Sequence, residues 1–194
     1  HEYSKEKNKL LKNNLVIIPA KGNSKRLKNK NILKIWGKPM LYWSIQAAKK
    51  SKFKNKIYVS SENEKILKYA KSQKVKTILR PHYLSQDNVF KMEVIRHALK
   101  EISKKLKPTL VISLQPNSPD IKSYEIDRGI EKLILEKLQE VVSVDENYNQ
   151  NAAFRIMTYN AAKQRDLSTY QGFVITNSTD IHTSKDIKKL KKQY

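Results

Sequence analysis

Cysteine is absent from this 194-residue chain, and glycine is scarce, with four residues in all. Without cysteine the chain has no disulfide and no thiolate metal site, which suits a cytoplasmic protein. No apolar run approaches the roughly 20 residues that a membrane span needs, and no signal-peptide core is recognisable. We therefore expect a cytoplasmic protein that does not insert into a membrane.

Arginine is also scarce, which bears on the high positive charge. The formal net charge is +22, and it comes from 34 lysines but only six arginines. A basic surface suggests nucleic-acid binding because it neutralises phosphates. Arginine, however, is the residue that reads phosphates and guanines with paired hydrogen bonds. A solvated lysine surface, as a biased genome produces, explains the charge more simply, and we expect no specific nucleic-acid partner.

The chain divides into a short tail and one domain. Residues 1–13 start at His1 without a methionine and read as a basic tail or a remnant of recombinant expression. Residues 14–194 are long enough for one domain with a hydrophobic core and too short for two comfortable ones.

Within the domain, short apolar runs alternate with segments that have apolar residues at helical spacing. Predicted strands cover 15–18, 56–60, 75–79, 109–115, 140–144, 152–159 and 172–177; predicted helices cover 39–51, 62–73, 89–106, 126–138, 160–168 and 184–192. Asp87 is the predicted cap of the third helix. This alternation predicts an α/β fold, with a mostly parallel sheet and helices on both faces.

The first predicted strand runs directly into a cationic loop, in the sequence NLVIIPAKGNSKRLKNKN (residues 14–31). In parallel sheets ligands bind beyond the carboxyl ends of the strands, so we expect an anion at this loop. Lys21 and Lys30 can hold a triphosphate, while Asn23 and Ser24 add amide and hydroxyl contacts. The glycine spacing matches neither a Walker loop nor GxGxxG, and on charge alone an ordinary surface turn is the alternative.

Four patterns follow one another along residues 15–143: IIPAKGNSKRLKNKN with GKPM, then VSSENEKILKYAKSQ, ILRPHYLSQD and LQPNSP. The first resembles IIPARxxSKRLPxKN with GKPL in the CMP-sugar synthetases. The second resembles the second strand and helix of that family, and the last two resemble its LRPxxLAxD and LQPTSP. These are the acylneuraminate cytidylyltransferases and their relatives acting on legionaminic, pseudaminic and ketodeoxyoctulosonic acids. The resemblance implies a Rossmann-like nucleotidyltransferase fold, and it is thin beyond residue 143.

The same resemblance implies how the cationic loop binds a nucleotide. Lys21 takes the position of the family's triphosphate arginine, and Ser24 and Lys30 also stand at phosphate-contacting positions. Arg26 belongs to the same nucleotide-binding set, and Asn31 matches a residue that reads the cytosine and ribose side. Lys21 and Lys30 are therefore predicted catalytic as well as binding residues, because they stabilise charge on the transferred phosphoryl group.

Three further positions are assigned by the later patterns. Arg80 matches a second residue on the cytosine and ribose side, and Gln115 and Ser118 match the floor of the sugar pocket. The structural alternatives are that Arg80 simply starts a turn before Pro81 and that Gln115 caps a helix.

A metal site is implied by the segment TDIHTSKD. In the sialic acid synthetases the corresponding DIDT segment supplies two aspartates to Mg²⁺, which prefers oxygen ligands. Here Asp180 is kept and His182 stands in place of the second aspartate, so Mg²⁺ is expected with Mn²⁺ as an alternative. Asp180 is thus a predicted catalytic and metal residue, whereas His182 either binds the metal or simply starts the final helix.

Three departures from the family pattern affect its implications. SPDI replaces SPLR, which removes an arginine and introduces Asp120, and Lys91 stands where relatives often have a small hydroxyl residue. Relatives also insert roughly forty residues, a dimerisation arm, where this chain has only the short turn ENYNQ. We therefore expect a monomer, or a dimer formed through another surface.

Three functions from different classes follow. The first is a cytidylyltransferase that activates a 2-keto sugar acid with CTP and releases pyrophosphate. This hypothesis includes an enzyme whose activity is impaired. The second is a nucleotide-binding relative without catalysis. The third, a basic nucleic-acid binder on the same fold, is the weakest because interleaved stacking aromatics are missing.

Overall fold

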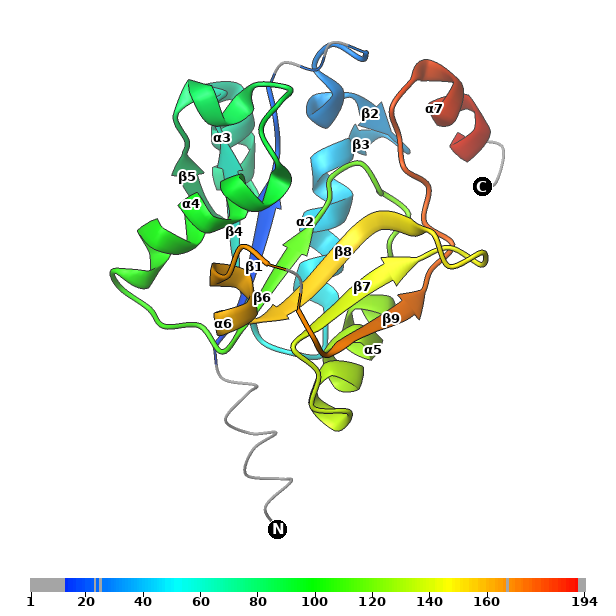
Figure 1. Ribbon diagram of the computed structural model, residues 1–194. Coiled ribbons are helices and arrows are strands. Elements are labelled where there is room, and N and C mark those ends of the chain that lie inside the picture. The colour runs from blue at the N-terminus through cyan, green and yellow to red at the C-terminus, as the bar shows by residue number, and fades with distance from the viewer. Residues whose placement is uncertain (1–12, 23, 25, 167, 192–194) are drawn as a thin grey trace.

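The computed structural model describes residues 13–22, 24, 26–166 and 168–191, so all of the predicted tail except Asn13 lies outside the described residues. The central sheet has seven strands in the order β5-β4-β1-β6-β8-β7-β9 (Figure 1). These strands are β1 (Asn14–Pro19), β4 (Asn55–Ser61), β5 (Lys76–Leu79), β6 (Leu110–Leu114), β7 (Glu140–Val144), β8 (Gln150–Thr158) and β9 (Gln171–Ile175). A small ribbon joins β2 (Lys34–Ile35) to β3 (Lys38–Pro39).

Helices connect the strands and cover both faces of the sheet. They are α2 (Met40–Lys50), α3 (Glu64–Ser72), α4 (Lys91–Ser103), α5 (Ser123–Leu135), α6 (Tyr159–Lys163) and α7 (Ser184–Lys191), with short 3₁₀ turns at Lys30–Ile32 and His82–Ser85. None of the described helices is both long and apolar enough to cross a membrane.

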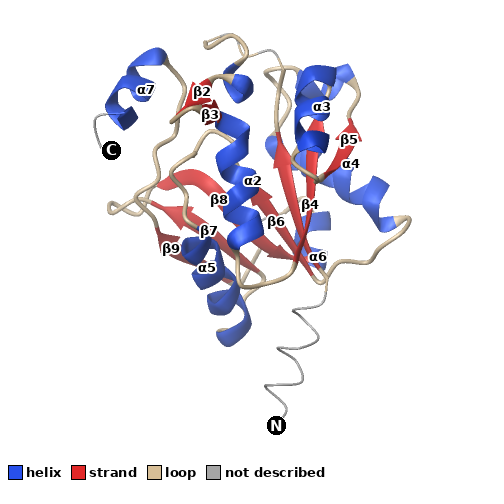
Figure 2. Ribbon diagram, turned by 180° about the vertical axis from the view of Figure 1, so that it is seen from behind, coloured by secondary structure: helices blue, strands red, loops and turns tan. Residues whose placement is uncertain are grey.

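The alternation of side chains along the strands produces two hydrophobic layers. On β1, Val16 and Ile18 pack in the layer with α2, α3 and α5, which Figure 2 shows in front of the sheet. Leu15 and Ile17 point the other way, into the layer with α4 and α6. All four side chains are fully buried. The predicted helices on both faces are confirmed.

The sheet is mostly parallel, as predicted: β1 pairs in parallel with β4 and β6, β4 with β5, and β7 with β9. β8, however, runs antiparallel to both β6 and β7. The cause is the short turn after β7, since a tight turn joins only antiparallel strands. The Asp145 carboxylate holds that turn by accepting hydrogen bonds from the amides of Asn147 and Asn149, both at 2.9 Å.

Several predicted helix ends were wrong. Asp87 does not cap the third helix; α4 starts at Lys91 after an uncapped Phe90, and Asp87 pairs with Lys21 instead. α5 starts at Ser123, earlier than predicted, because the Glu125 carboxylate accepts the Lys122 amide at 2.8 Å. α6 ends at Lys163, where the backbone becomes extended, rather than at residue 168.

Candidate functional site

The candidate site lies at the edge of the sheet where β1, β4, β5 and β6 end. The ends of β1 and β4 coincide, since Pro19 pairs with Ser60 and the Ala20 amide donates to the Ser60 carbonyl at 2.9 Å. The cationic loop, the residues after each of these strands, and the segment between β9 and α7 therefore meet at one edge. This is where ligands of parallel α/β sheets bind.

The cationic loop is fastened to its neighbours through its backbone. The Gly22 backbone amide donates to Glu62 Oε1 at 2.7 Å, and the side-chain Nδ2 of Asn31 donates to the Lys21 carbonyl at 2.7 Å. A Cβ on Gly22 would lie 2.6 Å from the Cβ of Asn63, so only glycine fits there. Ser24 is half-buried in this loop, whereas the predicted Asn23 lies outside the described residues.

Asn31 also carries an acceptor with no protein donor. Its side chain is 3% exposed, and its Oδ1 has no hydrogen-bond partner among the described residues. A buried polar atom of this kind costs free energy unless something pairs with it. A ligand amino group, such as that of a cytosine, would supply the missing donor.

Lys30 is a buried cation within this edge. It is 9% exposed, and its Nζ donates to the Ile181 carbonyl at 3.2 Å. Burial lowers the pKa of Lys30; Asp180 and Asp186 oppose the shift, while Arg26 and Lys21 add to it. The predicted residues Lys21, Arg26 and Asp180 thus all influence the ammonium group of Lys30.

Lys21 reaches across the mouth of the site. Its Nζ lies 2.5 Å from Asp87 Oδ1, and the two side chains are 30% and 49% exposed. Exposed ion pairs contribute little free energy. A more highly charged anion, such as a triphosphate, would compete readily with Asp87 for this lysine.

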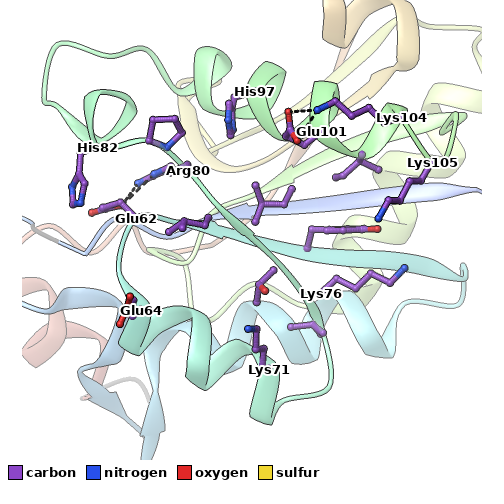
Figure 3. Close-up of a pocket in the computed structure, with 17 residues that line it drawn as sticks. Glu62, Glu64, Lys71, Lys76, Arg80, His82, His97, Glu101, Lys104 and Lys105 are labelled. Carbon is purple, nitrogen blue, oxygen red and sulfur yellow. Dashed lines mark hydrogen bonds and ion pairs between the residues drawn. The ribbon is translucent and has the colours of Figure 1, made fainter.

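Arg80 is buried behind the loop rather than displayed at its surface. Its guanidinium contacts Glu62 Oε2 at 3.0 and 3.2 Å and Ser85 Oγ at 2.9 Å, with the Arg80 and Glu62 side chains only 3% and 6% exposed (Figure 3). Burial raises the pKa of Glu62, but hydrogen bonds from Ser85 and the Gly22 amide, with the charge of Arg80, make the net shift downward. Arg80 therefore acts on the loop through Glu62, a residue that the sequence did not single out.

A cleft of about 1180 Å³ runs along β5 between α3 and α4, and Glu62 and Arg80 line one end of it (Figure 3). Lys21, Lys30 and Gln115 do not line it. The candidate site is therefore recognised by its charges and buried polar atoms, not by the size of a cavity.

Gln115 and Ser118 follow β6 and are 8% and 1% exposed. Gln115 Nε2 and Ser118 Oγ both lack a hydrogen-bond partner among the described residues. The two predicted sugar-pocket residues thus have an unused donor and an unused hydroxyl among the described residues, an arrangement suited to an oxygen-rich ligand.

Asp120, the departure noted in the sequence, has a clear structural role. Its two carboxylate oxygens accept from the Thr179 amide at 3.0 and 2.9 Å, and the Ile181 amide donates to the Asn117 carbonyl at 3.0 Å. Burial raises the pKa of Asp120. These contacts hold the segment after β9 against the loop after β6, and so bring Asp180 to Lys30.

The predicted metal residues are adjacent. His182 Nε2 and Asp180 Oδ2 are 2.8 Å apart, and the side chains are 43% and 33% exposed. Asp186 Oδ2 is occupied by the amides of His182 and Thr183, at 2.9 and 2.7 Å, which lower its pKa. Within the described ranges no three His, Cys, Asp or Glu residues form a metal-binding group. One carboxylate and one imidazole suit a cation that a nucleotide's phosphates and water also hold.

Lys91 is a further charged residue near Asp180 that the predicted site residues do not include, although it was noted as a departure from the family pattern. The residue is exposed, yet desolvation of its ammonium lowers its pKa; Asp180 opposes this shift and Arg155 adds to it. The charge of Asp180 therefore raises the pKa of two lysines against the effect of burial, Lys30 from the loop and Lys91 from the start of α4.

Comparison with known proteins agrees with this geometry. Residues 15–191 match the family described as Cytidylyltransferase. The N-acylneuraminate cytidylyltransferase of Escherichia coli is 37% identical over 131 residues, covering 67% of this chain and 30% of that protein. The pseudaminic acid cytidylyltransferase of Campylobacter jejuni is 36% identical over 88 residues, covering 45% and 38%. The chain thus matches only about a third of these relatives' lengths.

Solved structures give the same fold at lower identity. The CMP:2-keto-3-deoxy-manno-octonic acid synthetase complexed with CTP superposes with a TM-score of 0.73 at 14% identity, covering 93% of this chain and 98% of that one. The 4-diphosphocytidyl-2C-methyl-D-erythritol synthase of Anaerococcus prevotii has a TM-score of 0.64 at 11% identity, covering 96% and 100%. The predicted nucleotidyltransferase fold is confirmed.

Proposed function

Because the chain belongs to the cytidylyltransferase family, we propose that it transfers the cytidylyl group of CTP to a 2-keto sugar acid. The anomeric hydroxyl oxygen attacks the α-phosphorus and forms a new P–O bond. The bond from that phosphorus to the bridging oxygen breaks, pyrophosphate leaves, and the hydroxyl proton passes to solvent. The product is a CMP-sugar.

The observation that carries this proposal is the buried ammonium of Lys30 among the charges of Lys21, Arg26 and Asp180. A lysine held in a desolvated place is a prepared counter-charge for an anion. Phosphoryl transfer builds charge on the phosphoryl oxygens, and Lys21 and Lys30 are the groups that stabilise it.

The unpaired polar atoms support the assignment of binding positions for the two substrates, CTP and the sugar acid. Asn31 Oδ1 is an acceptor suited to the amino group of cytosine, and Gln115 Nε2 with Ser118 Oγ suits the oxygens of a sugar acid. Arg80 serves the base side indirectly, by holding Glu62 against the Gly22 amide.

Mg²⁺ or Mn²⁺ fits the site only together with the substrate. Asp180, with His182 beside it, would hold the ion while phosphate oxygens and water complete its coordination. When bound, the ion would neutralise charge on the phosphates. A solved structure with the same fold, Rv0371C of Mycobacterium tuberculosis at 11% identity, is a complex with manganese.

The test measures pyrophosphate release from CTP with Mg²⁺ and a panel of 2-keto sugar acids, beside thermal shifts with CTP, ATP, GTP and UTP. We expect CTP to raise the melting temperature most, since a ligand of the folded state stabilises it by mass action. Equal shifts with all four nucleotides would reject the cytidylyl assignment. A CTP-selective shift without pyrophosphate release would favour the second candidate, a nucleotide-binding relative, which the substitution at His182 motivates.

A further inference from the structure

The strand β5 lies at one edge of the central sheet. It pairs in parallel with β4, and no described strand pairs with the edge of β5 that faces away from β4, which we call the outer edge. An edge strand offers backbone N–H and C=O groups with which a further strand can pair. Every residue of β5 also lines the cleft between α3 and α4 (Figure 3). The outer edge of β5 therefore lies within a cleft.

The cleft extends around this edge to both faces of the sheet. Ile78 packs in the hydrophobic layer with α4, and Val75, just before β5, packs in the layer with α3. Both residues line the cleft. Leu79 points away from the face of Ile78, because side chains alternate along a strand, and it is 67% exposed. A strand placed at the outer edge would thus meet side chains of both helices as well as the backbone of β5.

Lysines gather at the end of the cleft where β5 begins. Four of them line it there: Lys71 of α3, Lys76 of β5, and Lys104 and Lys105 at the end of α4 (Figure 3). All four are exposed. Lys104 pairs with Glu101 at 2.9 Å, whereas the other three form no ion pair with a described residue. This end of the cleft therefore has an excess of positive charge.

We propose that the outer edge of β5 binds an acidic, extended peptide segment of another protein, which joins the sheet as a further strand. The main chain of such a segment pairs with the backbone of β5, and its carboxylates lie among the lysines. Lysines on an edge strand oppose pairing with a neutral or basic strand, because their ammonium groups would lose water without gaining a partner. An acidic strand supplies that partner. The proposal is independent of the proposed catalysis.

Other occupants fit this cleft less well. A second copy of the chain carries a net charge of +22, and residues 1–12 hold four lysines and two glutamates, so the lysines repel both. Single-stranded nucleic acid is acidic, but it lacks the backbone spacing of a β-strand and binds by stacking on aromatic rings. Tyr58 is the only described Phe, Tyr or Trp that lines the cleft, and Lys76 Nζ already lies 5.4 Å from its ring centroid.

The test uses a fluorescein-labelled peptide of about ten residues, long enough to cover β5, in which glutamate alternates with valine or threonine. Fluorescence anisotropy at low salt should give a micromolar dissociation constant that rises as salt is added. The same peptide with a methyl group on every backbone nitrogen keeps its charge but has no backbone donor. It should bind at least about tenfold more weakly, because backbone pairing provides much of the affinity in this mode.

Charge reversal tests the position of the site. The double variant Lys76→Glu/Lys105→Glu should raise the dissociation constant of the glutamate peptide by about tenfold or more, since attraction is replaced by repulsion. The matched control is Lys68→Glu/Lys100→Glu, which changes the net charge equally at two exposed lysines of α3 and α4 that do not line the cleft. It should change the dissociation constant less than about threefold. Circular dichroism confirms that each variant is folded.

Amide hydrogen exchange locates the bound peptide directly. We expect slower exchange in residues 76–79 and little change in the cationic loop. Protection confined to the cationic loop, equal binding of the methylated peptide, or equal losses in the two double variants would overturn the proposal, because each would show only a general attraction of charges. No binding up to about 1 mM peptide would also overturn it. Tighter binding of oligothymidine than of the peptide would assign the cleft to single-stranded nucleic acid instead.

Discussion

The hydrogen bonding of buried polar groups differs between two regions of the molecule. One is the edge that carries the cationic loop, and the other is the part of the sheet formed by β7, β8 and β9. At the loop edge, Asn31 Oδ1, Gln115 Nε2 and Ser118 Oγ are buried without partners, whereas no such atom occurs in the described residues of β7, β8 or β9. Glu140, 1% exposed, accepts from Arg155, Ser168 and Gln171, and Ser143 pairs with Phe154 through both its donor and its acceptor. One region leaves hydrogen-bonding capacity for a ligand, while the other uses it to hold the sheet.

Charge divides the same two regions. The loop edge gathers lysines around a buried ammonium, and the region of β7–β9 is almost free of lysine. A lysine surface as such does not indicate a ligand, because solvated lysines cost little. A lysine buried among other cations does indicate a ligand, because a buried charge is stable only if anions or ligands balance it. The proposed anion site therefore rests on the burial of Lys30 and not on the net charge of +22.

Among changes to the cationic loop, the most damaging should be at Lys30. Lys30→Met removes the buried counter-charge, and we expect kcat/KM for CMP-sugar formation to fall by about 10²–10³-fold, as when one preorganised electrostatic group is lost. Steady-state pyrophosphate release measures this. Lys34→Met, at an exposed lysine of β2, is the control and should change kcat/KM less than about twofold. Equal losses in both variants would mean that only the general charge of the loop matters.

The next largest effect should be on stability, at Glu62. Glu62→Gln leaves the buried charge of Arg80 without a carboxylate partner, and we expect the free energy of unfolding to fall by about 3 kcal/mol at neutral pH. The folded-state pKa of Glu62 is lowered, so its contribution is complete above the unfolded value near 4.5 and is lost as pH falls through the folded value. Urea unfolding should therefore show the two proteins converging in acid.

Glu101→Gln serves as the comparison for Glu62, because the Glu101–Lys104 pair is exposed and contributes little. A gap between wild type and Glu62→Gln that persists in acid would show that Glu62 acts through packing and not through its charge.

The smallest effect is expected from a substitution at His182, in the segment between β9 and α7. His182→Asp should raise the Mg²⁺-dependent rate a few-fold and reduce the advantage of Mn²⁺, because a second carboxylate is a harder ligand than imidazole. Asp180→Ala should abolish turnover with either ion, and Mn²⁺ binding in the presence of CTP provides a readout separate from activity. If His182→Asp changes nothing and Asp180→Ala is harmless, this segment binds no metal.

Local patterns in the sequence determined much of this protein. The alternation of apolar runs and helical segments predicted the α/β architecture, and the cationic loop after the first strand predicted an anion site, because a strand and the loop that follows it are adjacent in the chain. The quoted motifs also predicted the family. Each of these signals lies within a few consecutive residues, where the side-chain period and the turn chemistry suffice.

The tertiary structure decided the contacts between distant residues. Asp87 pairs with Lys21 instead of capping α4, Arg80 is enclosed by Glu62, and Asp120 brings the segment of Asp180 to Lys30. These outcomes depend on which surfaces pack together, since burial sets both the cost of a charge and the partner that offsets it.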